Sequence, residues 1–217
     1  MATPEGLGSA EPERDCPICS RLVAFRAEIR ANEPSWHAAP VHSFGDPDAR
    51  LLIVGLAPGM RGANRTGRPF TGDWAGDLLY DALDRFGFSR GRYAADPNDG
   101  LVLHDCMITN AVRCVPPQNK PVGAEINACR PFLANRIASL GRLTHLLTLG
   151  RIAHDSAVRA LGHRPSAAPF GHGASSKLQN YHIFSSYHCS RYNTNTGRLT
   201  PEMFDQVFDA LRSSLDA

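Results

Sequence analysis

The chain has 217 residues, 42% of them apolar, and a formal net charge of +2, which suits a single domain with a sizeable core. Residues 1–15 carry a net charge of −3, so the remainder carries +5, a mildly basic body compatible with a nucleic-acid partner. No apolar run approaches the roughly 18 residues of a membrane span, and the N-terminus lacks the basic and apolar regions of a signal peptide. We therefore expect a cytoplasmic protein with no membrane partner.

Residues 1–13 are rich in Gly, Pro, Ala and Glu, which predicts a disordered tail ahead of one domain over residues 14–217. Apolar residues recurring at helical spacing predict helices over residues 16–31, 73–86, 122–140, 151–161 and 201–215. Short apolar runs predict strands over residues 50–54, 107–113, 145–149 and 182–187. Because strand and helix alternate, the pattern predicts an α/β fold with a four-stranded parallel sheet flanked by helices.

A glycine-rich loop of about 18 residues follows the first strand and leads into the helix that begins near Asp73. Loops at the carboxyl ends of parallel strands are where α/β proteins bind ligands. Arg61, Arg65 and Arg68 lie in this loop without a nearby acid, so they are either phosphate contacts or ordinary surface arginines. Phe70 either stacks on a planar ligand or packs the loop onto the core. Asp73 is a favoured helix cap, and its carboxylate would also face the cleft.

Two further segments follow later strands. Asn110 lies within the second strand, where a buried amide must be satisfied either by a ligand or by neighbouring backbone. The loop 188–198 follows the fourth strand, so it should lie on the same sheet edge as the glycine-rich loop. His188 begins this loop, and Arg191 and Tyr192 form its expected tip.

The cysteines form a second pattern. Cys16 and Cys19 form a C-x-x-C pair, Cys114 follows the second strand, and Cys129 lies on the next predicted helix. Four thiolates suit either a [4Fe–4S] cluster or structural zinc, and the spacing does not choose between them. The alternative is that Cys114 and Cys129 are buried core thiols.

Three segments of the sequence carry extended motifs. They are Gly55-Leu-Ala-Pro58 with Gly62-x-Asn-Arg-Thr-Gly-Arg-x-Phe-Thr-Gly-Asp73, then Asn110-Ala-Val-Arg-Cys-x-Pro-Pro117, and last Ser186-Tyr-His-x-Ser-x-x-Asn-Thr-x-Thr-Gly-Arg-Leu-Thr200. In this order they resemble the first motif, the pocket strand and the second catalytic motif of one enzyme family, the type b (family 5) uracil-DNA glycosylases. The four cysteines match in order the ligands of the family's [4Fe–4S] cluster.

This resemblance implies a four-stranded parallel sheet and removal of uracil, and often of hypoxanthine or other deaminated bases, from DNA. It implies an abasic product, an uncut backbone and a structural [4Fe–4S] cluster, with zinc as the alternative. We further expect a monomer. The predicted catalytic residues are Asp73, His188 and Asn193, and the predicted base pocket is Gly55, Leu56, Ala57, Phe70 and Asn110. The predicted DNA contacts are Arg61, Arg65, Arg68, Ser190, Arg191, Tyr192 and Arg198, and the predicted cluster ligands are Cys16, Cys19, Cys114 and Cys129.

Two positions depart from the family pattern. Cys189 stands where proline is usual, which leaves the shape of the turn after His188 open. Gly59-Met60-Arg61 stands where many members have Ala-Ala-His, which removes a polar side chain near the target base.

The implied mechanism begins with a base flipped out of the duplex, with Arg191 and Tyr192 entering the gap. Asp73 would stabilise the cationic sugar and orient water, and His188, neutral or protonated, would stabilise the departing base. The alternative is a non-catalytic damaged-DNA-binding protein with the same cleft. A zinc deaminase lacks its H-x-E motif here, and a P-loop hydrolase lacks its G-x-x-x-x-G-K-[ST] motif.

Overall fold

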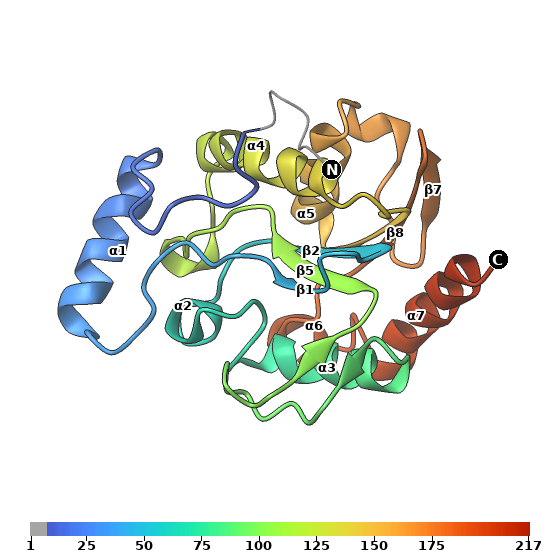
Figure 1. Ribbon diagram of the computed structural model, residues 1–217, viewed down its shortest axis with the longest axis horizontal. Coiled ribbons are helices and arrows are strands. Elements are labelled where there is room, and N and C mark those ends of the chain that lie inside the picture. The colour runs from blue at the N-terminus through green and yellow to red at the C-terminus, as the bar shows by residue number, and fades with distance from the viewer. Residues whose placement is uncertain (1–7) are drawn as a thin grey trace.

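The computed structural model describes residues 8–217 and is built around one sheet (Figure 1). Its strands are β1 (Phe44–Gly45), β2 (Leu51–Gly55), β5 (Cys106–Asn110), β6 (His145–Leu149), β7 (Ser175–Leu178) and β8 (Tyr181–Ser186), in the order β1-β5-β2-β6-β8-β7. The four central strands β5, β2, β6 and β8 are parallel, and the two edge strands β1 and β7 are antiparallel to their neighbours. The predicted α/β class and the four parallel strands are confirmed.

The predicted number of strands is wrong, because the sheet has six rather than four. Strand β1 is only two residues long, and β7 is a polar strand, Ser-Ser-Lys-Leu, within the predicted loop 162–180. Neither segment carries the continuous apolar run that marks a strand buried on both faces. A separate two-stranded sheet joins β3 (Ser89–Arg90) to β4 (Val102–Leu103).

Alternation along β2 assigns a helical layer to each face of the sheet. Leu51 and Ile53 share a core with α3 (Trp74–Arg85) and α7 (Pro201–Leu215), whereas Leu52 and Val54 share a core with α4 (Gly123–Ser139) and α5 (Arg151–Ala160). Successive strand residues point to opposite faces, so one five-residue strand supports both layers. Figure 1 shows α3 and α7 on one side of the sheet and α4 and α5 on the other.

The remaining helical segments are short or peripheral. Helix α1 (Ser20–Asn32) lies beside the body rather than over the sheet (Figure 1). The short helices α2 (Ala63–Thr66) and α6 (Arg191–Asn195) lie within the two loops expected to carry function, and η1 (Pro117–Asn119) and η2 (Pro165–Ala167) are single 3₁₀ turns. No helix in residues 8–217 is long and apolar enough to cross a membrane.

Part of the predicted disordered tail is held against the body. The carboxylate of Glu11 forms ion pairs with Arg113, at 2.8 Å, and with Arg136, at 2.6 Å. The amide of Asn135 also donates to the carbonyl of Ser9 at 2.9 Å. Residues 8–13 therefore differ from the predicted disordered tail, because ion pairs and a hydrogen bond fix a segment whose composition is typical of disorder. Residues 1–7 of the predicted tail lie outside the described residues.

Candidate active site

A cleft of about 660 Å³ opens at the carboxyl ends of the parallel strands. Its walls come from the segments that follow β2, β5, β6 and β8, as the topology of a parallel sheet requires. The predicted residues that line it are Leu56, Ala57, Phe70, Asp73, Asn110, His188, Ser190, Arg191 and Tyr192. The sheet thus brings together residues that are far apart in the sequence, the most distant pair being Leu56 and Tyr192, 136 positions apart.

Asn110 and Phe70 form the floor of the cleft at the end of β5. Asn110 is 2% exposed, and its Oδ1 atom is buried without a hydrogen-bond partner. The Phe70 ring lies beside it: a Cβ atom added at Gly55 would be 2.4 Å from Asn110 Oδ1 and 2.6 Å from Phe70 Cζ. Glycine at position 55 is therefore required for the amide and the ring to share this floor. An unpaired buried acceptor costs free energy unless a ligand donates to it.

Asp73 lies at the first turn of α3. Its Oδ1 atom accepts a hydrogen bond from the Gly76 backbone N–H at 3.2 Å, so the predicted helix cap is present. Its Oδ2 atom faces Gly59 and Gly62, where an added Cβ would lie at 2.6 and 2.1 Å. Burial raises the pKa of the Asp73 carboxyl, against the lowering effect of the backbone N–H groups of α3.

His188 lies opposite, in the turn after β8. Burial lowers its pKa to about 4, so the imidazole is neutral near pH 7. The sequence left both protonation states open, and the structure favours the neutral ring, which offers one N–H donor. The ring is 6.0 Å from the Phe70 ring, centroid to centroid, at an interplanar angle of 26°.

Asn193 and Cys189 hold the His188 turn from outside the cleft. Asn193 Nδ2 donates to the carbonyl oxygen of His188 at 2.8 Å, so its amide positions the turn and does not line the cleft. The buried Cys189 thiol lies 3.4 Å from the carbonyl oxygen of Ala75, in the first turn of α3. Cys189 thus links the turn after β8 to the first turn of α3.

The arginines of the glycine-rich loop divide into two groups. Arg61 and Arg65 are exposed, and Arg65 Nε donates to the carbonyl of Arg61 at 2.8 Å. Arg68 is 4% exposed and pairs with Asp99 through two hydrogen bonds, at 2.7 and 2.8 Å. The prediction that Arg68 contacts DNA is therefore wrong, because its guanidinium is buried and already neutralised.

The rim of the cleft is aromatic and basic. Tyr192 is 72% exposed, Trp74 is 45% exposed and Ile152 is 42% exposed. The Arg191 guanidinium lies 5.2 Å from the centre of the Trp74 ring. Arg198 and Tyr187 do not line the cleft, and the Arg198 guanidinium lies 4.6 Å from the centre of the Tyr187 ring. Trp74, Arg151 and Ile152 also line the cleft and were not among the predicted site residues. The position of Arg151 and Ile152 directly after β6 is the signal that would have found them, because each parallel strand ends at the cleft.

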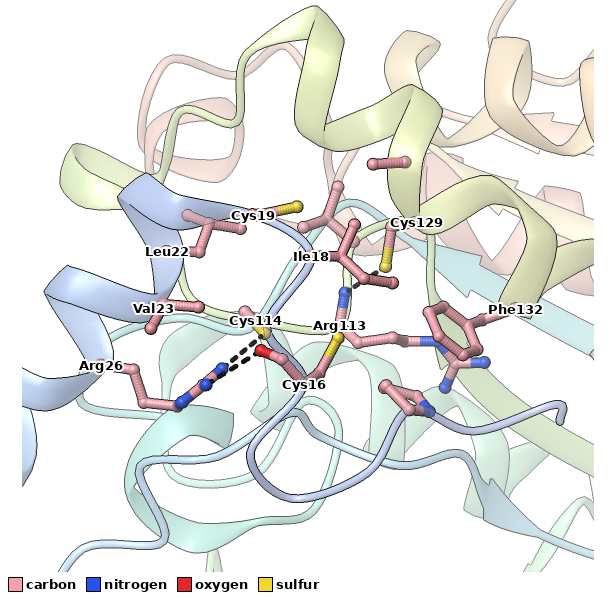
Figure 2. Close-up of a pocket in the computed structure, with 13 residues that line it drawn as sticks. Cys16, Ile18, Cys19, Leu22, Val23, Arg26, Arg113, Cys114, Cys129 and Phe132 are labelled. Atoms are coloured by element: carbon pink, nitrogen blue, oxygen red, sulfur yellow. Dashed lines mark hydrogen bonds between the residues drawn. The ribbon is translucent and has the colours of Figure 1, made fainter.

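The four predicted metal ligands line a second, small cavity of about 20 Å³ (Figure 2). It lies between the segment before α1, the segment after β5, and α4. All four are free thiols, and Cys114 and Cys129 receive hydrogen bonds from Arg26 Nη1, at 3.6 Å, and from the Arg113 backbone N–H, at 3.3 Å. Within residues 8–217, no group of three or more His, Cys, Asp or Glu side chains is arranged as a metal site. The donor set, the apolar walls and the N–H···S bonds fit a sulfur-ligated centre.

Comparisons with known proteins agree with this geometry. The profile of the Uracil DNA glycosylase superfamily matches residues 42–212. The chain is 48% identical to a type-5 uracil-DNA glycosylase of Thermus thermophilus, over 88% of this chain and 90% of that protein. It is 40% identical to one of Mycobacterium leprae, over 89% and 88%, and 36% identical to one of Pyrobaculum aerophilum, over 94% and 89%. The chain therefore belongs to the uracil-DNA glycosylase superfamily and is a member of its type-5 family.

Proposed function

We propose that this protein is a monofunctional DNA glycosylase that hydrolyses the N-glycosidic bond of uracil in DNA and leaves an abasic site. One observation carries the proposal: the unpartnered Asn110 Oδ1 and the Phe70 ring form the floor of a cleft that Asp73 and His188 also face. Family membership, with type-5 uracil-DNA glycosylases among the relatives, supports the same activity.

The base pocket selects for a ring N–H group. Asn110 Oδ1 needs a donor, and uracil presents one at N3, whereas N3 of cytosine is an acceptor. The Phe70 ring offers a face for stacking the flipped base. Hypoxanthine and xanthine also carry a ring N–H beside a carbonyl, so we include them among the proposed substrates.

Bond cleavage would use Asp73 and His188 in different roles. As the C1′–N1 bond breaks, positive charge develops on the sugar and negative charge on the base. The Asp73 carboxylate would stabilise the cation and orient the water whose oxygen bonds to C1′. Neutral His188 would donate a hydrogen bond to the uracil O2 atom as it gains charge. Water supplies hydroxyl to the sugar, and its proton balances the departing uracil anion.

The test of the chemistry is single-turnover release of uracil from single- and double-stranded oligonucleotides. We expect Asp73→Asn and His188→Ala each to lower the rate by at least about 100-fold, as is common for groups that act on transition-state charge. A wild-type rate in Asp73→Asn would refute the mechanism. Binding of uracil-containing DNA by the wild type without any release would favour a non-catalytic damage-binding protein. A panel with hypoxanthine and xanthine in the same buffer would establish the base range.

DNA binding would use the exposed basic and aromatic rim. Arg61, Arg65 and Arg198 would contact phosphates, with Ser190 as a small hydrogen-bonding group. Arg191 and Tyr192 would enter the gap left by the flipped base. The protein would bind as a monomer.

The four cysteines would hold a structural [4Fe–4S] cluster, with zinc as the alternative ligand. Such a centre would fasten the segment before α1 to the strand end at Cys114 and to α4. Purified protein should be brown, with broad visible absorbance and iron and sulfide in equal amounts, and Cys129→Ser should lose the colour. A colourless protein that contains zinc would refute the cluster without affecting the proposed glycosylase activity.

A further inference from the structure

The turn between Phe70 and Asp73 is held in an unfavourable backbone conformation. Phe70 has φ = +52°, a left-handed value that costs a non-glycine residue free energy unless its surroundings enforce it. The same turn is packed against α3: a Cβ added at Gly76 would lie 1.8 Å from the Phe70 carbonyl oxygen. Such strain requires a support outside the turn.

Tyr93 provides that support. Its hydroxyl accepts a hydrogen bond from the Gly72 backbone N–H at 3.2 Å and donates one to the Phe70 carbonyl oxygen at 3.3 Å. The one hydroxyl therefore bridges the backbone on both sides of Thr71. Its ring stacks on the Tyr80 ring at 4.4 Å, and the Tyr80 hydroxyl donates to the Pro69 carbonyl at 2.8 Å.

The loop that carries Tyr93 is folded around Arg68. Asp99 accepts two hydrogen bonds from the Arg68 guanidinium and two more from the backbone N–H groups of Ala94 and Leu101. The guanidinium also lies 5.7 Å from the centre of the Tyr93 ring. The Arg68–Asp99 pair thus fixes the loop 93–101 against the turn between Phe70 and Asp73, which follows Arg68 in the sequence.

We propose that Tyr93 is a positioning residue for base excision: held by Arg68 and Asp99, it fixes the Phe70–Asp73 turn so that the ring and the carboxylate face the cleft together. The inference rests on the proposed function, since it gives Phe70 and Asp73 their roles. Tyr93 is not among the residues that line the cleft, so its proposed role is positioning rather than catalysis.

The experiment removes the hydroxyl alone, with Tyr93→Phe. We expect single-turnover uracil release to fall about 10-fold or more, since small misplacements of catalytic groups are costly, with the Kd for uracil-containing DNA unchanged. The matched control is Tyr181→Phe, at the start of β8 and the opposite end of the strand from His188, which should keep the wild-type rate. A purely structural loss would lower the unfolding temperature but leave the rate of the folded enzyme intact.

A second readout does not depend on activity. The chain has two tryptophans, so Trp36→Phe leaves Trp74, next to Asp73, as the only one. In that background Tyr93→Phe should increase acrylamide quenching of Trp74, because the turn becomes more mobile. Asp99→Asn weakens the pairing of Arg68 with the loop 93–101, so it should also lower the rate of uracil release and increase the quenching of Trp74. This variant replaces Tyr93→Phe as the test if Tyr93→Phe does not fold.

The outcomes separate the two proposals. An unchanged rate in Tyr93→Phe overturns the positioning role, whether or not quenching changes. A raised Kd that accounts for the whole loss of rate also overturns it. If the wild type releases no uracil, the proposed function fails, and the quenching alone decides whether Tyr93 holds the turn.

Discussion

At the scale of single residues, Gly55 lies directly against the two side chains that form the floor of the cleft. In Gly55→Ala, the new methyl would overlap Asn110 Oδ1 and Phe70 Cζ, which belong to two buried side chains. We expect a loss of stability of about 1–3 kcal/mol from overpacking and a loss of uracil release of at least about 100-fold from displacement of the pocket. Chemical denaturation and single-turnover assays measure the two effects.

The matched control for Gly55→Ala is Gly123→Ala. Gly123 is the first residue of α4, and an added Cβ would meet no atom within 4 Å. Alanine there should leave the release rate unchanged and keep or slightly raise stability. Equal activity in the two variants would show that the pocket floor adjusts, contrary to the geometry.

At the scale of elements, α6 is coupled to α3 across the mouth of the cleft. Trp74 Nε1 donates to Thr194 Oγ1 at 2.9 Å, while Arg191 packs over the indole ring. Trp74→Phe would keep a ring but lose the hydrogen bond, worth about 0.5–1.5 kcal/mol net. We expect a roughly 2- to 10-fold loss of uracil release from duplex DNA and little loss from single strands, where no base must leave a stack.

Assays on matched single- and double-stranded oligonucleotides measure this difference. Thr194→Val removes the other half of the same hydrogen bond, so it should reproduce the defect, and the double variant should be no worse than either single one. Equal losses on both substrates would show that Trp74 acts on the catalytic site rather than through α6.

The strands that could be predicted from the sequence are the four that lie in the buried centre of the sheet. The four parallel strands are predictable because each is buried on both faces and reads as a short apolar run, as in Leu51-Leu-Ile-Val. The edge strands were missed because β1 is too short for a pattern and β7 is polar. Their pairing is decided by the neighbouring strand, not by their own sequence.

The candidate site divides in the same way. The cleft contains Asp73, Phe70, Asn110 and His188. Their positions at or after the ends of parallel strands, together with the motifs around them, made this meeting predictable. Arg68 was misassigned because its partner Asp99 lies 31 residues away in a loop without a motif. A charge can be recognised in a sequence, but its neutralisation by a distant residue is a property of the fold.

For the whole molecule, two histidines make stability depend on pH. Burial lowers the pKa of His188 to about 4, and burial together with the neighbouring His182 lowers that of His145 to about 4. An unfolded chain has histidine pKa values near 6.5, so between about pH 6.5 and 4 it binds protons that the folded protein excludes. Stability must therefore fall as the pH drops through this window.

We expect each histidine to cost about 1–2 kcal/mol of unfolding free energy between pH 7 and pH 5. Urea unfolding at the two pH values measures the loss, and His145→Gln should reduce it. His104→Asn, at an exposed position, is the control and should keep the wild-type difference. A difference that is the same in His145→Gln as in the wild type would contradict the assignment.

The carboxylate of Glu11 pairs the N-terminal segment with two arginines of the body. Arg113 is 0% exposed, and its guanidinium is neutralised by Glu11, whose pKa lies below its usual value because Arg113, Arg136 and hydrogen bonds from Ser43 outweigh burial. Glu11→Gln would leave a buried positive charge without its counter-charge. We expect a loss of about 3 kcal/mol in unfolding free energy, the scale found when one partner of a buried pair is removed.

Glu11→Gln should also loosen the cysteine cavity around Arg113. The Arg113 backbone N–H donates to Cys129 Sγ, and Cys114 is the residue after Arg113. In chelator-treated protein, Glu11→Gln should therefore speed the reaction of the Cys114 and Cys129 thiols with a thiol reagent. Glu13→Gln, at an exposed neighbouring acid, should change neither stability nor thiol reactivity by a measurable amount. If Glu11→Gln is as stable as Glu13→Gln, the ion pairs of Glu11 contribute little to the attachment of this segment.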